Sequence, residues 1–362
     1  DGQNLFSPGK TPRQNARFLV FLAAFIQGVD EYQNFLRCTV ASAGNDNRLG
    51  ANEAPPAIVS IFLGSELDGV VRSIIDGTNY QEPEKSLLRI GVDVMPVIPK
   101  DTTDRNRTSP LAFTGNKFEL RMLGSSQSIA GPNIALNTIM AEELGKFADE
   151  LEKAEDFDAA LQKLVCKALT EHQRIIFDGN GYSEQWRQEA HRRGLSELRT
   201  TAEALPSYIS QENIDLVVRH GIFTEAEFRA RYQIHMDAYR KIVCIEARTM
   251  ADMARQQILP AAMGYCRNLC EGLRLKKELG ISSEAESAIV VKLSQVCDEC
   301  QLAAAALEET LAKIPEGEQG AAWCCHVILP AMAKLRTSAD SLEQLTAKNA
   351  WPYPTYSDLL FY

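Results

Sequence analysis

Helical periodicity over more than half of the sequence is the feature that most constrains the fold. From Pro132 onward the chain is rich in Ala, Glu, Leu, Lys, Arg and Gln. Pro132 suits a first helical turn, and we expect that helix to reach about Leu151. We therefore predict an antiparallel helical region over 132–350, followed by an aromatic tail over 351–362 that packs on its own chain or on a neighbouring subunit.

Two sequence patterns mark the starts of long helices inside this region. Thr224-Glu-Ala-Glu227 and Ser283-Glu-Ala-Glu286 are typical of capping boxes. The second is followed by apolar residues at helical spacing from Ile289 to Leu311, which predicts one buried helix face. We expect Gly280 and Pro315 to end the flanking helices.

Residues 1–131 have a different composition, with eight of the fifteen prolines. Apolar periodicity predicts helices over 15–37 and 67–75 and extended runs over 38–42, 57–62, 88–98 and 117–123. Loops rather than regular crossover helices separate these runs, which favours an antiparallel sheet. The predicted class is α+β and helix-rich overall, with the sheet inside residues 1–131.

Charge and hydropathy exclude two classes of partner. The chain has 38 Lys and Arg against 48 Asp and Glu, a net charge of −10, which disfavours nucleic acid and anionic membrane surfaces. The longest apolar run, Phe18–Ile26, has nine residues, whereas a membrane-spanning helix needs about 20. We expect a cytoplasmic protein.

Nine cysteines are too few for a disulfide scaffold in 362 residues. The pairs Cys266/Cys270 and Cys297/Cys300 fall inside predicted helices. Zinc would need further ligands, and His326 is the one histidine nearby, so we favour buried core thiols over a metal or redox site.

Charged residues gather at two junctions of the first part. A loop over 42–56 carries Arg48 and Glu53, which could close over a ligand or form a solvated ion pair. In the run over 117–123, Glu119 and Arg121 should share one face, because side chains alternate along a strand. A carboxylate beside a guanidinium suits an anion and metal site, although a surface ion pair has the same spacing.

These segments resemble the glutamine synthetases. Asn106-Arg107-Thr108-Ser109 and Lys117-Phe118-Glu119-Leu120-Arg121 are similar to that family's Asn-Arg-Ser and Glu-x-Arg motifs, and Arg48 with Glu53-Ala-Pro-Pro56 to its flap segment. Phe113-Thr-Gly-Asn-Lys117, Ile176-Phe-Asp-Gly-Asn-Gly-Tyr182 and the Trp351-Pro-Tyr-Pro-Thr-Tyr356 ending look like the long type III branch. The family joins ammonia to glutamate with ATP, through γ-glutamyl phosphate and with magnesium or manganese.

The resemblance implies that residues 1–131 are the C-terminal part of a catalytic domain, and it implies a role for each matched residue. Glu119 would bind the metal that bridges the ATP phosphates, and Lys117 would contact the nucleotide phosphates. Arg121 and Arg48 would bind the carboxylates of glutamate. The two remaining matches are catalytic: Arg107 would stabilise the phosphoryl group and Glu53 would close the flap over the acyl phosphate.

The resemblance also implies what this sequence lacks. The family has a second phosphoryl arginine where this chain has Ala112, and its other metal ligands precede the segment matched by Asp1. We therefore expect the C-terminal half of a type III enzyme, inactive alone and part of a homo-oligomer of stacked hexameric rings. A helical scaffold or oligomerisation module with an incomplete site is the alternative.

Overall fold

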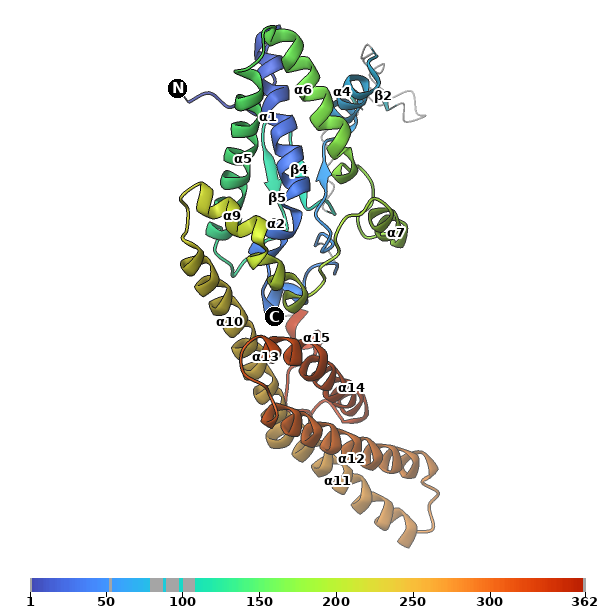
Figure 1. Cartoon of the computed structure of the whole chain (residues 1–362). Coiled ribbons are helices and arrows are strands. Elements are labelled where there is room, and N and C mark those ends of the chain that lie inside the picture. The colour runs from blue at the N-terminus through green and yellow to red at the C-terminus, as the bar shows by residue number, and fades with distance from the viewer. Residues whose placement is uncertain (1, 52–53, 79–86, 89–97, 100–107, 361–362) are drawn as a thin grey trace. The chain divides into compact units, whose positions relative to one another are not determined.

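The computed structural model describes residues 2–51, 54–78, 87–88, 98–99 and 108–360. The chain divides into two compact units, Asp1–Tyr232 and Gln233–Tyr362, and α10 (Glu225–Met253) carries the chain from one to the other (Figure 1). No helix in the described part combines the length and apolar character needed to cross a membrane.

The first unit is built on a small mixed sheet. Its strand order is β1 (Ile61–Phe62), β4 (Leu111–Phe113) and β5 (Phe118–Leu120). Strands β4 and β5 are antiparallel, as predicted, whereas β1 pairs with β4 in parallel. A separate antiparallel pair joins β2 (Leu87–Leu88) to β3 (Ile98–Pro99). The helix-rich α+β class is confirmed, with one parallel pair in the sheet.

One face of the sheet packs against the N-terminal helix α1 (Pro12–Glu31) through aromatic side chains. Phe25 stacks on Phe118 with ring centroids 4.0 Å apart, and Phe18 approaches Phe113 at 6.0 Å. A capping box between Thr11 and Gln14 starts α1. The aromatic contacts therefore fix which face of β5 is turned to the core.

The chain after α1 differs from the sequence prediction. The predicted single helix over 15–37 is broken at Tyr32, after which α2 (Gln33–Thr39) follows. The predicted strand over 38–42 is wrong, because these residues form the end of α2 and the entry to α3 (Ala43–Asp46). The predicted run over 88–98 lies mostly outside the described residues.

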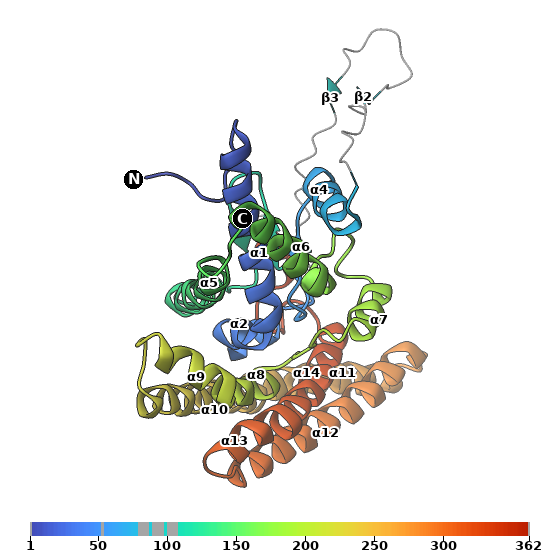
Figure 2. The ribbon, with the colours of Figure 1, turned by 45° about the horizontal axis from the view of Figure 1, so that its top comes forward.

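Helices surround α1 in the first unit, with α5 and α6 alongside it (Figure 2). The predicted helices over 67–75 and 132–151 are confirmed as α4 and α5. The remaining helices have these bounds: α4 Ser65–Asp76, α5 Ala130–Leu151, α6 Phe157–His172, α7 Glu184–Arg192, α8 Thr201–Ala204 and α9 Gln211–Arg219. The composition change near residue 131 thus falls inside one compact unit, and the assignment of 1–131 to a catalytic domain stays a prediction.

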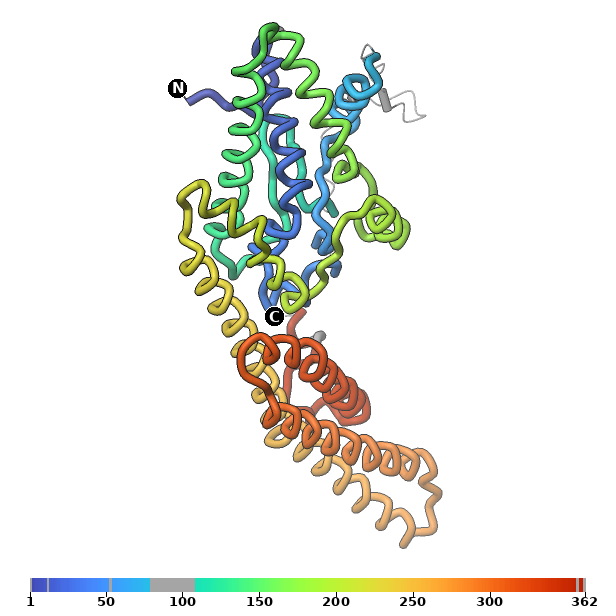
Figure 3. Tube along the Cα trace, viewed as in Figure 1, coloured from blue at the N-terminus to red at the C-terminus, as the bar shows by residue number. Residues whose placement is uncertain are grey.

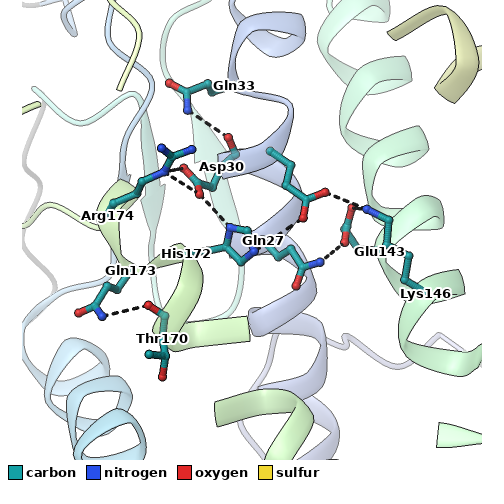
Figure 4. A network of polar contacts seen from close by, with 10 residues as sticks. Gln27, Asp30, Gln33, Glu143, Lys146, Thr170, His172, Gln173 and Arg174 are labelled. Carbon is teal, nitrogen blue, oxygen red and sulfur yellow. Dashed lines mark hydrogen bonds and ion pairs between the residues drawn. The ribbon is translucent and has the colours of Figure 1, made fainter. Parts of the chain in front are cut away.

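A polar network ties α1 to the helices beside it (Figure 4). Asp30, 2 % exposed, lies 2.8 Å from Nδ1 of His172 and accepts a hydrogen bond of 2.8 Å from Nε of Arg174. On the α5 side, Glu143 accepts hydrogen bonds from Gln27 at 2.6 Å and Lys146 at 2.8 Å. Buried carboxylates need such partners, because an unpaired one would be strongly destabilising.

The second unit is entirely helical in its described part, and α11 and α12 form an antiparallel hairpin (Figure 3). Its helices after α10 are α11 Leu259–Glu278, α12 Glu284–Ala312, α13 Glu318–Trp323, α14 Leu329–Leu345 and α15 Tyr356–Leu360. Two π-helical turns, Ala254–Ile258 and Cys324–Ile328, each end at the Ile of an Ile-Leu-Pro-Ala sequence. The wider turn accommodates a proline that cannot donate a backbone hydrogen bond.

The helix starts and the buried helix face predicted within 132–350 are partly confirmed. Thr224 and Glu227 form a capping box, and α12 buries Leu293, Val296 and Leu307 on one face. The capping box predicted at Ser283 is wrong, because that side chain makes no cap hydrogen bond and Glu286 pairs with Lys276 at 2.6 Å instead.

The cysteines can also be compared with their prediction from the sequence. All nine cysteines are free. Cys297 and Cys300 are buried, as predicted for core thiols, whereas Cys270 is exposed.

In the aromatic tail, the rings of Trp351 and Tyr353 contact each other edge to face, with their centroids 6.4 Å apart.

Gly28 sets how closely α1 and α5 can approach. A Cβ atom at Gly28 would lie 2.3 Å from Cγ2 of Ile139, whereas one at Gly145 would meet nothing within 4 Å. We expect Gly28→Ala to lower the free energy of unfolding by about 1–3 kcal/mol through overpacking. Gly145→Ala, the matched control, should raise it by about 0.5–1 kcal/mol. Urea denaturation checks both, and stabilisation by Gly28→Ala would contradict the close packing.

Glu143 should make stability depend on pH. Burial raises the pKa of Glu143 from 4.5 to about 7, despite the opposing hydrogen bond from Lys146, while the nearby charge of Glu31 adds to the rise. Between these values the folded chain holds a proton that the unfolded chain releases, so the free energy of unfolding falls as pH rises. In Glu143→Gln this decline should be shallower than in the wild type, as measured by urea denaturation from pH 4.5 to 7.5. Parallel curves would contradict it, and Glu150→Gln on the exposed side of α5 is the control.

Candidate functional site

Strand β5 and the residues that flank it present three charged side chains on one side of the sheet. Lys117, Glu119 and Arg121 alternate with residues that face α1, as the period of a strand requires. Oε1 of Glu119 lies 3.4 Å from Nζ of Lys117, and Oε2 lies 3.2 Å from Nη2 of Arg121. The predicted sharing of one face by Glu119 and Arg121 agrees with this geometry.

The three charged side chains, Lys117, Glu119 and Arg121, differ in how much of their surface is exposed to solvent. The side chains of Lys117, Glu119 and Arg121 are 63 %, 40 % and 21 % exposed. The hydrogen bond from Arg121 is the main reason why the pKa of Glu119 lies below its ordinary value. An ionised carboxylate is thus presented beside two cationic groups, an arrangement that can bind a divalent cation and an anionic ligand together.

Arg48 reaches the carboxyl-terminal end of the same strand. Its Nη1 donates to the backbone oxygen of Met122 at 2.9 Å, and its Nη2 donates to that of Arg121 at 3.1 Å. The structure therefore brings Arg48 next to the backbone of Arg121. Within the described residues, the guanidinium of Arg48 donates hydrogen bonds to these two backbone carbonyl groups.

Two of the predicted site residues, Glu53 and Arg107, lie outside the described residues. Thr108, which follows Arg107 in the sequence, accepts a hydrogen bond from the backbone N–H of Gly181 at 2.9 Å. Ala112 is fully buried and stands opposite Glu119 in the strand register. Its methyl group therefore occupies a core position on the neighbouring strand.

Sequence reasoning missed two polar residues near these strands. Asn45, 3 % exposed, donates to the backbone oxygen of Met122 at 2.9 Å. Asp178 accepts a hydrogen bond from the backbone N–H of Leu63 at 2.9 Å, and burial raises its pKa. The glycines flanking Asn180 were the available signal for a tight loop at Asp178, but no spacing pattern marked Asn45.

A divalent metal would find one suitable ligand here. Glu119 offers a hard oxygen donor, which fits magnesium or manganese. In the described part of the chain no three His, Cys, Asp or Glu side chains are grouped closely enough to hold a metal ion. Glu119 therefore fits as one ligand of a larger set.

Comparisons with known proteins connect this geometry to a family. Residues 160–277 match the family model described as the glutamine synthetase C-terminal domain. Over 374 residues the chain is 40 % identical to the type-3 glutamine synthetase of Dictyostelium discoideum, covering 99 % of this chain and 51 % of that protein.

Two bacterial relatives give the same picture. The chain is 39 % identical to a glutamine synthetase of Butyrivibrio fibrisolvens and 37 % identical to one of Bacteroides fragilis (strain YCH46), covering 52 % of each. The chain spans about half the length of the curated relatives that it matches. Over almost its whole length, this chain is thus similar in sequence to half of a type-3 glutamine synthetase.

Proposed function

We propose that this chain supplies part of the active site of a glutamate–ammonia ligase, which forms glutamine from glutamate, ammonia and ATP. The observation that supports this most is the Glu119–Arg121 pair on β5, 3.2 Å apart, in a chain with glutamine synthetase relatives. The pair sets a metal ligand beside an anion-binding group, as the transfer of a phosphoryl group to a carboxylate requires.

In this proposal each group of β5 has one task. Glu119 is a ligand of magnesium or manganese, which neutralises charge on the ATP phosphates when bound. Arg121 binds the side-chain carboxylate of glutamate, because its planar fork can donate two hydrogen bonds to one carboxylate. Lys117, the most exposed of the three, contacts the nucleotide phosphates.

The family likeness extends the proposal to three more residues. Arg107 stabilises the phosphoryl group during transfer, and Glu53 closes over the γ-glutamyl phosphate so that ammonia rather than water attacks it. Arg48 binds the carboxylates of glutamate.

The remaining metal ligands and the ammonium site must come from elsewhere in a complete enzyme. One carboxylate is too few to hold magnesium, and the chain covers about half of its relatives. We propose that the complete enzyme is a cytoplasmic homo-oligomer of stacked hexameric rings, and that residues 1–362 alone are inactive.

Arg121→Ala tests the substrate assignment in the complete polypeptide that carries this chain. Losing a hydrogen bond to a charged group of about 1.5–3 kcal/mol should raise KM for glutamate about 10- to 150-fold. Steady-state kinetics with varied glutamate measure this. Arg72→Ala, whose side chain is 74 % exposed on α4, is the control and should behave as the wild type. Unchanged glutamate kinetics in Arg121→Ala would refute the assignment.

Glu119→Gln tests the metal assignment. The amide keeps the size of the side chain but lacks the negative charge that a hard cation prefers. We expect the Kd for manganese, measured by titration in the presence of ADP, to rise about tenfold or more. Glu66→Gln, an exposed position on α4, is the matched control. Wild-type manganese affinity in Glu119→Gln would remove this carboxylate from the metal site.

A further inference from the structure

Residues 176–181, between the short helix η1 (Gln173–Ile175) and α7, form a bridging segment on the edge of the three-stranded sheet. Ile176 pairs in parallel with Ile61 of β1, and the backbone N–H of Phe177 donates to Ile61 O at 2.8 Å. The bridging segment lies within residues 160–277, which match the glutamine synthetase C-terminal domain. Part of that domain therefore contacts the sheet that carries Glu119.

The bridging segment holds both ends of the long connection from β1 to β4. At the start of the connection, Oδ1 of Asp178 accepts a hydrogen bond of 2.9 Å from the backbone N–H of Leu63, which directly follows β1. At its end, the backbone N–H of Gly181 donates to Oγ1 of Thr108 at 2.9 Å, shortly before β4 begins.

Gly181 allows two stretches of backbone to come unusually close. A Cβ atom at this position would lie 2.7 Å from the backbone oxygen of Thr108. Gly181 is buried, and it is not one of the glycines with a positive φ. The absence of a side chain is therefore needed for the approach to Thr108 and not for a left-handed backbone.

The bridging segment is itself held by α7 and the residue after it. The ring of Phe177 stacks on that of Trp186, which is 1 % exposed, with centroids 3.7 Å apart. Nη1 of Arg193 donates to Ile176 O at 2.9 Å, and its guanidinium lies over the Trp186 ring. These contacts fix the positions from which Asp178 and Gly181 reach the sheet.

The part of the chain that Gly181 contacts connects two residues of the proposed function. Thr108 follows Arg107 in the sequence, and consecutive Cα atoms are only about 3.8 Å apart, so fixing Thr108 limits where Arg107 can lie. Further along, Pro110 O accepts a hydrogen bond of 2.8 Å from the backbone N–H of Arg121. A shift at Thr108 would therefore act on the phosphoryl-binding arginine and on β5.

We propose that Asp178 and Gly181 are positioning residues, through which the C-terminal domain holds the residues before β4 in place for phosphoryl transfer. This inference rests on the proposed function. Asp178 acts through the backbone of Leu63, and Gly181 acts by leaving room for Thr108.

Two substitutions of Asp178, made in the complete polypeptide, separate positioning from direct contact with a ligand. Asparagine keeps Oδ1 as an acceptor for the N–H of Leu63 but has no charge, whereas alanine removes the acceptor. Asp178→Ala should lower kcat about 10- to 100-fold and leave KM for glutamate and ATP within about twofold. Asp178→Asn should keep kcat within about threefold of the wild type. Equal losses in the two variants would show that the charge itself acts on a ligand, and would overturn the inference.

Gly181→Ala tests the other end of the connection without removing any group that could contact a substrate. We expect the same selective fall in kcat, with faster hydrogen exchange of the backbone N–H groups of Leu111 and Arg121, which donate to Ser60 and Pro110. Gly272→Ala is the matched control, because a Cβ atom there would meet nothing within 4 Å. A wild-type kcat, or a lower kcat with unchanged exchange of these two N–H groups, would contradict the proposal.

Stability measurements complete the test. If one of Asp178→Ala and Gly181→Ala does not fold, the other decides. If neither folds, the segment serves stability and the inference is wrong. Wild-type kinetics in both, together with a raised KM for glutamate in Arg121→Ala, would end this inference and leave the proposed function intact. An unaffected Arg121→Ala would instead end the proposed function.

Discussion

Side-chain alternation along β5 places aromatic residues in the core on one face of the sheet and the charged cluster of Lys117, Glu119 and Arg121 on the other. Phe118 stacks on Phe25 of α1, and this contact commits the neighbouring Glu119 to the opposite face of the sheet. A shift of one residue in register would exchange the two faces. The aromatic contact therefore determines where the carboxylate and guanidinium lie, and the helices around α1 hold that contact in place.

The helical packing that supports β5 combines close approach with paired charges. Gly28 allows α1 to lie against α5. Asp30 accepts a hydrogen bond from Arg174, and Glu143 accepts hydrogen bonds from Gln27 of α1 and from Lys146 of its own helix. These two carboxylates differ in role from Glu119. They stabilise the packing of the helices, whereas the side chain of Glu119 is 40 % exposed and available to a ligand. In the second unit two π-helical turns, each ending at the Ile of an Ile-Leu-Pro-Ala sequence, allow a proline to lie inside a long helical run.

Local patterns in the sequence predicted those features that depend on neighbouring residues. The start of α5 near Pro132, the Thr224 capping box and the shared face of Glu119 and Arg121 are of this kind. The Asn45–Met122 contact joins residues 77 positions apart, so no periodicity could reveal it. The capping box predicted at Ser283 is missing because Glu286 pairs with Lys276 instead, a contact ten residues apart that the local pattern did not reveal. The assignment of Arg107 came from family likeness alone.

The most direct measurement is a crystal structure of the complete polypeptide with manganese, ADP and glutamate, using anomalous scattering to locate the metal. We expect manganese bonded to the carboxylate of Glu119 and the side-chain carboxylate of glutamate bound to Arg121. Manganese bound away from β5, with Arg121 paired only to Glu119 while glutamate lies elsewhere, would contradict a catalytic role for this strand.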